Sequence, residues 1–159
     1  MERTLIIIKP DLVEKNVIGD VIAYFERNGL IVRNIRSVRA EREILWTHYE
    51  TIGLLHSRLS KKFDEDKSLE IVNQVIDYMM EGLIVPIALE GVDAVSRVRD
   101  LIGATDPSEA DPSSLRALYC SGESRQLANA ENRAVRNGIH ASAVIEEAEK
   151  ELVLWFPEE

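Results

Sequence analysis

Two hydrophobic patterns alternate along the chain. Short continuous apolar runs, such as Leu5 to Ile8, are typical of buried strands. Elsewhere apolar side chains recur every three or four residues, as from Leu69 to Met79, which is the spacing of one helix face. These patterns predict strands over residues 3–9, 30–39 and 83–89 and a short one from residue 139. They predict helices over residues 17–28, 41–49, 69–80, 92–102 and 142–152.

Residues with special backbone or capping properties mark several of these boundaries. Pro10 stops the first strand, and Asn16 stands where it can cap the first helix. Ser142 is the predicted cap of the last helix, because Glu146 and Glu147 follow in the first turn, where the helix dipole favours acids.

The order of these elements is strand, helix, strand, two helices, strand, helix, strand, helix. It predicts an α+β fold of the ferredoxin-like, split βαβ type, in which helices cover one face of a four-stranded antiparallel sheet. The polar stretch over residues 104–138 is expected to be a long loop, and a loop of this length is usually either functional or disordered. A length of 159 residues fits a single domain over residues 1–159.

Charge and composition narrow the classes of partner. The net charge of −9 argues against a nucleic-acid partner, which would require a surplus of Lys and Arg. No apolar stretch approaches the roughly 20 residues that a membrane span requires, so no membrane partner is expected. The single cysteine, Cys120, cannot form an intramolecular disulfide, which favours a reducing compartment. We therefore expect a cytoplasmic protein.

Two common kinds of binding site are absent from the sequence. The eight glycines never approach closely enough to form a P-loop or a dinucleotide fingerprint, so a phosphate site must be built from side chains. No pair of His or Cys has metal-ligand spacing, so no protein metal site is predicted.

A few polar residues stand at the ends of apolar elements. His140 lies among small residues at the end of a strand, where a ligand could reach the ring, although such a histidine is often only a hydrogen-bonded filler. Lys9 ends the first strand just before Pro10, where it could have a functional role or could simply be exposed to solvent. His48 and His56 lie in or beside helical patterns and are interpreted as ordinary half-buried or surface residues.

Motifs spread along the chain resemble the nucleoside diphosphate kinase family. They are Lys9-Pro10-Asp11, Ile18-Gly19, Phe25-Glu26-Arg27, Gly29-Leu30, Leu101-Ile102-Gly103-Ala104-Thr105-Asp106-Pro107 and Arg136-Asn137-Gly138-Ile139-His140-Ala141-Ser142. The resemblance covers residues 3–49, 75–116 and 132–157, with the motifs in the family's order.

The resemblance implies an enzyme, a phosphotransferase with a ping-pong mechanism. The γ-phosphate of a nucleoside triphosphate passes to His140 and then to a nucleoside diphosphate. A neutral imidazole is a competent nucleophile for this step. Residues that match the family's phosphate and sugar ligands are Lys9, Arg99, Thr105, Arg116 and Asn137. Residues that match those holding the histidine and lysine in place are Tyr49, Ser142 and Glu151.

Other implications of the resemblance concern the metal, the base and the assembly. Mg²⁺ is expected to arrive with the nucleotide, held by the phosphate oxygens and not by the protein. The residue that stacks on the base is expected to be Ile71 or, alternatively, Phe63. A homo-oligomer is expected, because family members form tetramers or hexamers of dimers.

The sequence departs from the family pattern at several positions. Ala143 replaces an acid that commonly follows the serine of the histidine motif, and Ala117-Leu118 replaces a usual Gly-Asp pair. Insertions near residues 51–70 and 117–131 lengthen the chain, and their polarity places them at the mouth of the cleft and at subunit contacts. They leave open an alternative function, that of a catalytically weakened nucleotide-binding regulatory or interaction protein.

Overall fold

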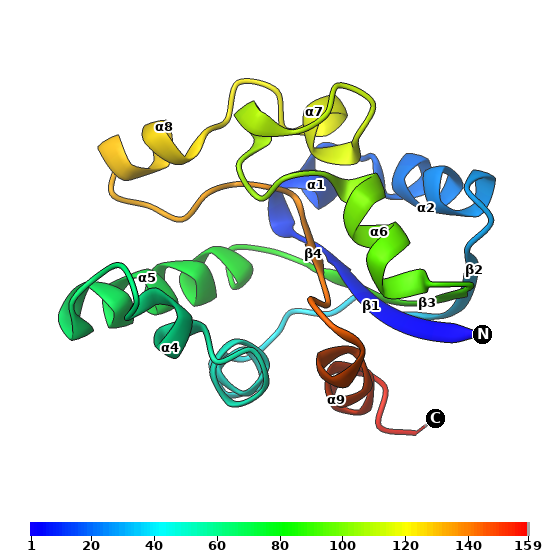
Figure 1. The fold of residues 1–159 in the computed structure, drawn as a ribbon, viewed down its shortest axis with the longest axis horizontal. Coiled ribbons are helices and arrows are strands. Elements are labelled where there is room, and N and C mark those ends of the chain that lie inside the picture. Colours follow the sequence, from blue (N-terminus) through cyan, green and yellow to red (C-terminus); the bar gives the residue numbers. More distant parts are fainter. Residues whose placement is uncertain (159) are drawn as a thin grey trace.

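A computed structural model describes residues 1–158 and contains one four-stranded sheet (Figure 1). The strand order is β2-β3-β1-β4, and every neighbouring pair is antiparallel. The strands are β1 (Glu2–Ile8), β2 (Ile31–Ile35), β3 (Val85–Gly91) and β4 (Ile139–Ala141). β1 and β3 are the two central strands, and helices connect each strand to the next one in the sequence. The split βαβ arrangement predicted above is therefore confirmed.

Helices surround this sheet. They are α1 (Pro10–Glu14), α2 (Ile18–Arg27), α3 (Arg42–Trp46), α4 (Leu55–Leu59), α5 (Glu65–Met79), α6 (Ala94–Ile102), α7 (Leu115–Tyr119), α8 (Arg125–Ala130) and α9 (Ile145–Trp155). A π-helix, η1 (Thr47–Ile52), continues α3, and a 3-10 turn, η2 (Pro107–Glu109), follows α6. No helix within the described residues is long and apolar enough to cross a membrane.

The sheet is covered on both faces, so the expectation that helices cover one face is wrong. Ile6 and Ile8 of β1 pack with Phe25 of α2 in one apolar core, which α6 completes. Leu5 and Ile7 belong to a second core on the opposite face, with side chains from α3, α5 and α9. Figure 1 shows α2 and α6 above the sheet and α5 and α9 below it. Strand β1 is therefore buried on both sides, which explains its unbroken apolar run.

Several predicted boundaries differ from the structure. The stretch over residues 104–138 is not one long loop, because it folds into η2, α7 and α8. Both predicted caps are wrong, since Val17 and Val144 occupy the N-cap positions of α2 and α9. Asn16 instead adopts a positive φ of 58°, and the Ser142 hydroxyl bonds to a buried carboxylate described below.

The pairing of β1 with β4 assembles residues that lie far apart in the sequence. Ile7 lies opposite His140, and the Lys9 amide donates to the Gly138 carbonyl at 2.8 Å, which extends the ladder by one bond. Lys9 and His140 are thereby fixed at the same end of the sheet. Gly138 has a φ of 76°, and the atoms around it leave no room for a side chain.

This tight packing gives a first prediction. A Cβ at Gly138 would approach Leu12 to 2.8 Å and the Cys120 Sγ to 2.9 Å, so Gly138→Ala combines backbone strain with overpacking. We expect the free energy of unfolding to fall by about 3 kcal/mol, measured by urea denaturation. Gly122→Ala is the matched control, because Gly122 has a φ of 87° but no atom within 4 Å of its Cβ position. Equal losses in the two variants would contradict the packing argument.

Candidate active site

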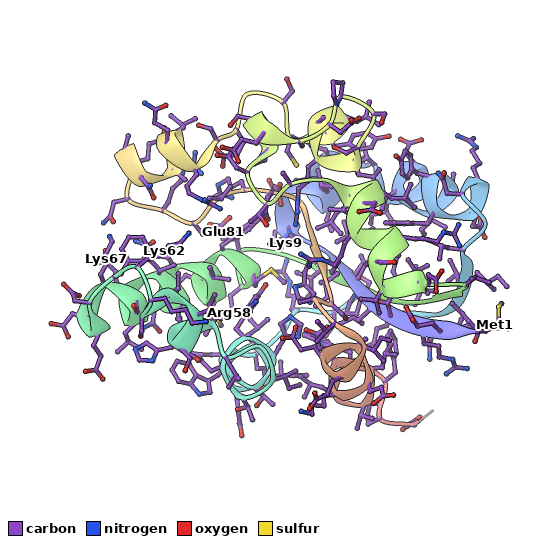
Figure 2. The ribbon with its side chains drawn as sticks, viewed as in Figure 1. Met1, Lys9, Arg58, Lys62, Lys67 and Glu81 are labelled. Atoms are coloured by element: carbon purple, nitrogen blue, oxygen red, sulfur yellow. The ribbon has the colours of Figure 1, made fainter. Side chains whose placement is uncertain are left out.

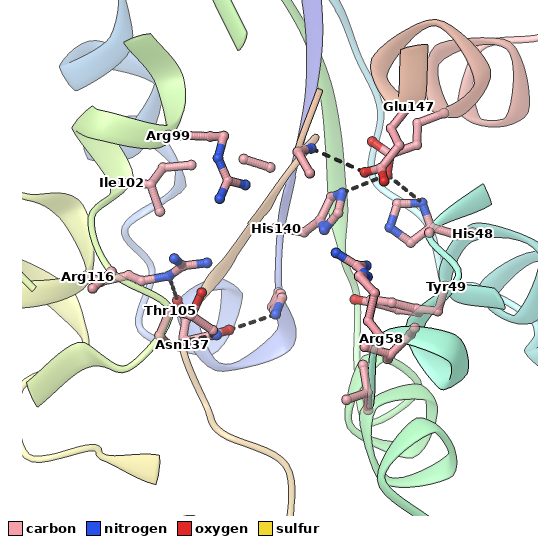
Figure 3. Close-up of a pocket in the computed structure, with 18 of the residues that line it drawn as sticks. His48, Tyr49, Arg58, Arg99, Ile102, Thr105, Arg116, Asn137, His140 and Glu147 are labelled. Carbon is pink, nitrogen blue, oxygen red and sulfur yellow. Dashed lines mark hydrogen bonds and ion pairs between the residues drawn. The ribbon is translucent and has the colours of Figure 1, made fainter. Parts of the chain in front are cut away.

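A cavity of about 340 Å³ opens at the end of the sheet where β1 and β4 bring Lys9 and His140 together (Figure 3). Most of the predicted site residues line it, although they come from separate parts of the chain. Those residues are Lys9, Tyr49, Arg99, Thr105, Arg116, Asn137, His140 and Glu151. Ser142 is fully buried behind the cavity and contacts Glu151. The two base-stacking candidates, Phe63 and Ile71, are not among the lining residues, whereas Leu55 and Val75 are.

His140 is held by a buried carboxylate. Its Nε2 lies 3.1 Å from Oε1 of Glu151, and the Ser142 hydroxyl donates to the other oxygen of the same carboxylate. Burial alone would raise the pKa of Glu151, but the charge and hydrogen bond of His140 outweigh it and lower the pKa to about 2. Glu151 is therefore a carboxylate at neutral pH and can only accept hydrogen bonds.

The ionisation state of Glu151 determines which nitrogen of the His140 ring carries the hydrogen. Because the carboxylate cannot donate, Nε2 of His140 must carry the hydrogen of the 3.1 Å bond. In the neutral imidazole the lone pair then lies on Nδ1, the other ring nitrogen. The side chain is 17% exposed, so a ligand in the cavity can reach the ring.

Lys9 is a buried ammonium group on the opposite wall. Its Nζ donates to Oδ1 of Asn137 at 2.7 Å and lies 5.4 Å from the centre of the Tyr78 ring. Burial, and then the nearby charge of Arg116, lower the pKa of Lys9 to about 7. In the unliganded protein at neutral pH, this amine is therefore only partly protonated.

Arg116 connects three segments of the cavity wall. Its guanidinium donates to the carbonyls of Gly103, Asn137 and Ile139 at 2.8, 3.1 and 2.6 Å. The Asn137 amide in turn donates to the Thr105 carbonyl at 3.1 Å. Arg116 therefore holds the cavity together as well as contributing a positive charge to it.

His48 is a site residue that the sequence reasoning interpreted as ordinary. Its side chain is completely buried, and its ring centre lies 4.4 Å from that of His140, with the planes at 76°. Trp155 donates its indole N–H to Nδ1 of His48 at 3.1 Å. Burial lowers the pKa of His48 to about 3, so the ring is neutral. Glu151 and Trp155, one turn apart on α9, thus contact the two histidines.

These contacts bear on metal binding. His48, His140 and Glu151 each offer a ligand atom, and the three atoms lie within 4.8 Å of one another. Sequence spacing could not reveal this group, because His48 and His140 lie 92 positions apart in the sequence. The hydrogen bonds described above use one ring nitrogen of each histidine and both oxygens of the Glu151 carboxylate. We assign no step of the chemistry to a metal ion at this group.

Two further charged residues line the cavity and were not predicted. Glu147 accepts a hydrogen bond from the Ala143 amide at 3.3 Å, so α9 places a carboxylate next to the position where the family's usual acid is missing. Arg58, from α4, reaches the cavity from the side of Tyr49 (Figure 3). Both lie in patterns that look like solvated helix faces, and no sequence signal separates them from surface charges.

Comparison with known proteins supports the sequence resemblance. The family model described as nucleoside diphosphate kinase matches residues 2–159. A nucleoside diphosphate kinase from a Nitratiruptor species is 36% identical, covering 98% of this chain and 96% of the relative. One from Saccharolobus islandicus is 33% identical, covering 98% and 95%.

Solved structures agree with this result. An NDP kinase from Pyrobaculum aerophilum superposes with a TM-score of 0.90 at 32% identity, covering 99% of this chain and 96% of that one. The nucleoside-diphosphate kinase from Borrelia burgdorferi, solved as a transition state mimic with bound vanadate and ADP, gives 0.87 at 30% identity, with coverage of 99% and 88%. Because sequence and fold agree over nearly the whole length, the chain belongs to the nucleoside diphosphate kinase family of phosphotransferases.

Proposed function

We propose that His140 accepts the γ-phosphoryl group of a nucleoside triphosphate and passes it to a nucleoside diphosphate. The observation that carries this proposal is the hydrogen bond between His140 Nε2 and the Glu151 carboxylate. It leaves the lone pair of the neutral ring on Nδ1, so no separate base is required to generate the nucleophile.

Each half of the reaction exchanges one bond for another. In the first half, the Nδ1 lone pair of His140 forms a bond to the γ-phosphorus while the bond from that phosphorus to the bridging oxygen breaks. The nucleoside diphosphate leaves with the electron pair of the broken bond. The positive charge that develops on the ring is shared through Nε2–H with Glu151. In the second half, a terminal oxygen of another nucleoside diphosphate attacks the same phosphorus and restores the neutral ring.

Charge neutralisation would come from the chain and from the nucleotide's own metal. Lys9, Arg99 and Arg116 line the cavity and supply cations to the phosphates, while Thr105 and Asn137 supply hydrogen bonds. The nucleotide enters with a divalent cation, Mg²⁺, which its phosphate oxygens hold. Ile71 and Phe63 remain the candidates for base stacking from sequence, with Leu55 and Val75 added as residues that line the cavity.

The alternative of a weakened nucleotide-binding regulatory protein is less well supported. A binding protein needs the cations of the cavity but has no use for a histidine whose tautomer is set by a buried carboxylate. Assembly as a homo-oligomer and a cytoplasmic location remain part of the proposal.

One experiment separates the two functions. The protein is incubated with Mg²⁺ and ATP labelled on the γ-phosphate, and we expect label on the protein that is labile to acid and stable to alkali, as a phosphoramidate is. Unlabelled GDP should then remove it and yield labelled GTP. Nucleotide binding without label on the protein would support the regulatory alternative.

A further inference from the structure

A buried tyrosine of α5 lies against the lysine of the cavity. Tyr78 stands in the last turn of this helix, and only 3% of it is exposed. The Lys9 Nζ lies 5.4 Å from the centre of its ring, within the range at which the face of an aromatic ring attracts a cation. Figure 2 shows Lys9 and Glu81 at one end of α5 and Lys67 at the other, so the contact is made at the end of the helix that leads into β3.

The hydroxyl of the same tyrosine is anchored to α1. It donates a hydrogen bond to Oδ1 of Asp11, which lies in the first turn of α1, two residues after Lys9. A buried phenol requires such a partner, because an unpaired hydroxyl group away from water costs free energy. The Tyr78 ring is therefore held from two sides, by its own helix and by the short helix that follows Lys9.

A second cation over the ring has a counter-ion of its own. The guanidinium carbon of Arg136 lies 5.3 Å from the ring centre, and Glu81 accepts two hydrogen bonds from this guanidinium at 2.7 and 2.8 Å. Lys9 forms no ion pair within residues 1–158, where its ammonium group contacts the amide oxygen of Asn137 and the Tyr78 ring. The position of Lys9 thus depends on neutral partners.

The charge near Lys9 comes from several elements. The titratable and charged groups that face it are Asp11, His48, Tyr78, Arg116, Cys120 and Arg136. His48 is neutral, and burial raises the pKa of the Cys120 thiol and of the Tyr78 phenol, so both are uncharged at neutral pH. Asp11 is therefore the anionic side chain of this set. Burial and Arg116 lower the pKa of Lys9, and the charge of Asp11 opposes them.

We propose that Tyr78 and Asp11 are a positioning pair that holds the Lys9 ammonium group toward the phosphates of the nucleotide. Neither residue lines the cavity, so both act through Lys9. The pair gives a role to the aspartate of the Lys9-Pro10-Asp11 motif, which the proposed function leaves without one. The inference rests on the proposed function, since it requires that Lys9 meets phosphate.

Replacing the carboxylate tests the electrostatic part of this role. Asp11→Asn keeps an oxygen that can accept from Tyr78, but it removes the charge that favours a protonated Lys9. The pKa of Lys9 should then fall below 7. Binding of Mg²⁺–ADP at pH 7 should take up close to one proton, measured by calorimetry, where the unaltered protein takes up about half of one. The pH above which kcat/KM falls should drop by roughly half a unit or more.

The matched control for this substitution is Glu14→Gln. Glu14 lies in the same helix as Asp11 and is exposed, so removing its charge should change neither the proton uptake nor the pH profile.

Replacing the ring tests the geometric part. Tyr78→Leu removes the face that attracts the ammonium group, so kcat for transfer from ATP to GDP should fall about tenfold, with KM changed less than about threefold. Tyr78→Phe keeps this face and loses the hydroxyl, so it should retain at least about a third of the activity. Tyr24→Phe is the control, because its hydroxyl donates to the Ser113 carbonyl and Tyr24 does not line the cavity. Its activity should be unchanged.

Three results would overturn the pair. They are equal proton uptake by Asp11→Asn and the unaltered protein, a loss in Asp11→Asn that is the same at every pH, and equal kcat in folded Tyr78→Leu and Tyr78→Phe. Where Tyr78→Leu does not fold, the proton uptake of Asp11→Asn decides, since the calorimetry needs neither that variant nor turnover. Any of these results with normal transfer through His140 would remove the pair and leave the proposed function standing.

Discussion

With His140 replaced by alanine, the protein is expected to take up no phosphate from labelled ATP, and transfer to GDP should fall by at least about a thousandfold. The reason is that Nδ1 of His140 is the atom that forms the bond to phosphorus, and no other described group in the cavity combines a neutral ring nitrogen with exposure to a ligand. His48 is the nearest alternative, but its side chain is fully buried and its Nδ1 accepts a hydrogen bond from Trp155.

Two further variants make this result decisive. His140→Ala leaves the buried Glu151 carboxylate with fewer partners, so its melting temperature must be measured alongside. His140→Gln offers an amide donor to the same carboxylate and should fold where the alanine variant does not. His56→Ala, which changes a histidine that does not line the cavity, should keep full labelling. Label on either His140 variant would show that the phosphate is carried elsewhere.

Lys9→Met should lower the rate of phosphoryl transfer by about a hundredfold. The substitution keeps the bulk of the side chain, but it removes a charged donor from a buried position where charge develops on the transferring group. The measurement is kcat/KM for transfer from ATP to GDP. A loss of less than about threefold would mean that the phosphates bind away from Lys9.

The lowered pKa of Lys9 adds a signature that a structural role would not produce. At pH 8 an amine with a pKa of about 7 is mostly neutral, and a bound polyanion favours its protonation. Binding of Mg²⁺–ADP at pH 8 should therefore take up about one proton, and binding at pH 6 about none. Calorimetry in buffers of different ionisation enthalpy measures this number. Lys9→Met should abolish the uptake.

The lowered pKa of Lys9 also predicts how the free energy of unfolding changes with pH. The pKa falls from 10.5 in the unfolded chain to about 7, so between these values the unfolded chain binds more protons than the folded one. The free energy of unfolding of the unliganded protein should therefore gain from this group as pH rises from 7 to 10. Below pH 7 the amine is charged in the folded protein as well, and the free-energy cost of burying it lowers the free energy of unfolding by its full amount.

Long elements with a strong pattern were predictable from sequence, and short ones were not. The apolar run of β1 and the spacing of α2 and α6 carry enough periodicity to be recognised. Helices α7 and α8 have 5 and 6 residues, too few to show a period. Ser114 and Ser124 cap them, and their surroundings read as a polar loop.

Some residues of the site could likewise be predicted from the sequence, and others could not. Residues within motifs, such as Lys9, Asn137 and His140, could be assigned by resemblance because their identity is tied to their neighbours in the sequence. His48 could not, because its role depends on Trp155, which lies 107 positions away. Arg58 could not either, because it lines the cavity from a segment whose sequence is polar and looks solvated.

The position of Glu151 and Trp155 on α9 has a consequence for the order of events during synthesis. A nascent chain that ends before residue 145 already contains His140 and the cations of the cavity, but it has no acceptor for the Nε2–H of that ring. Nothing then determines which nitrogen holds the lone pair. Competence to accept phosphate should therefore begin only when α9 docks against β1 and not earlier. Docking of α9 would thus determine which nitrogen of His140 acts as the nucleophile.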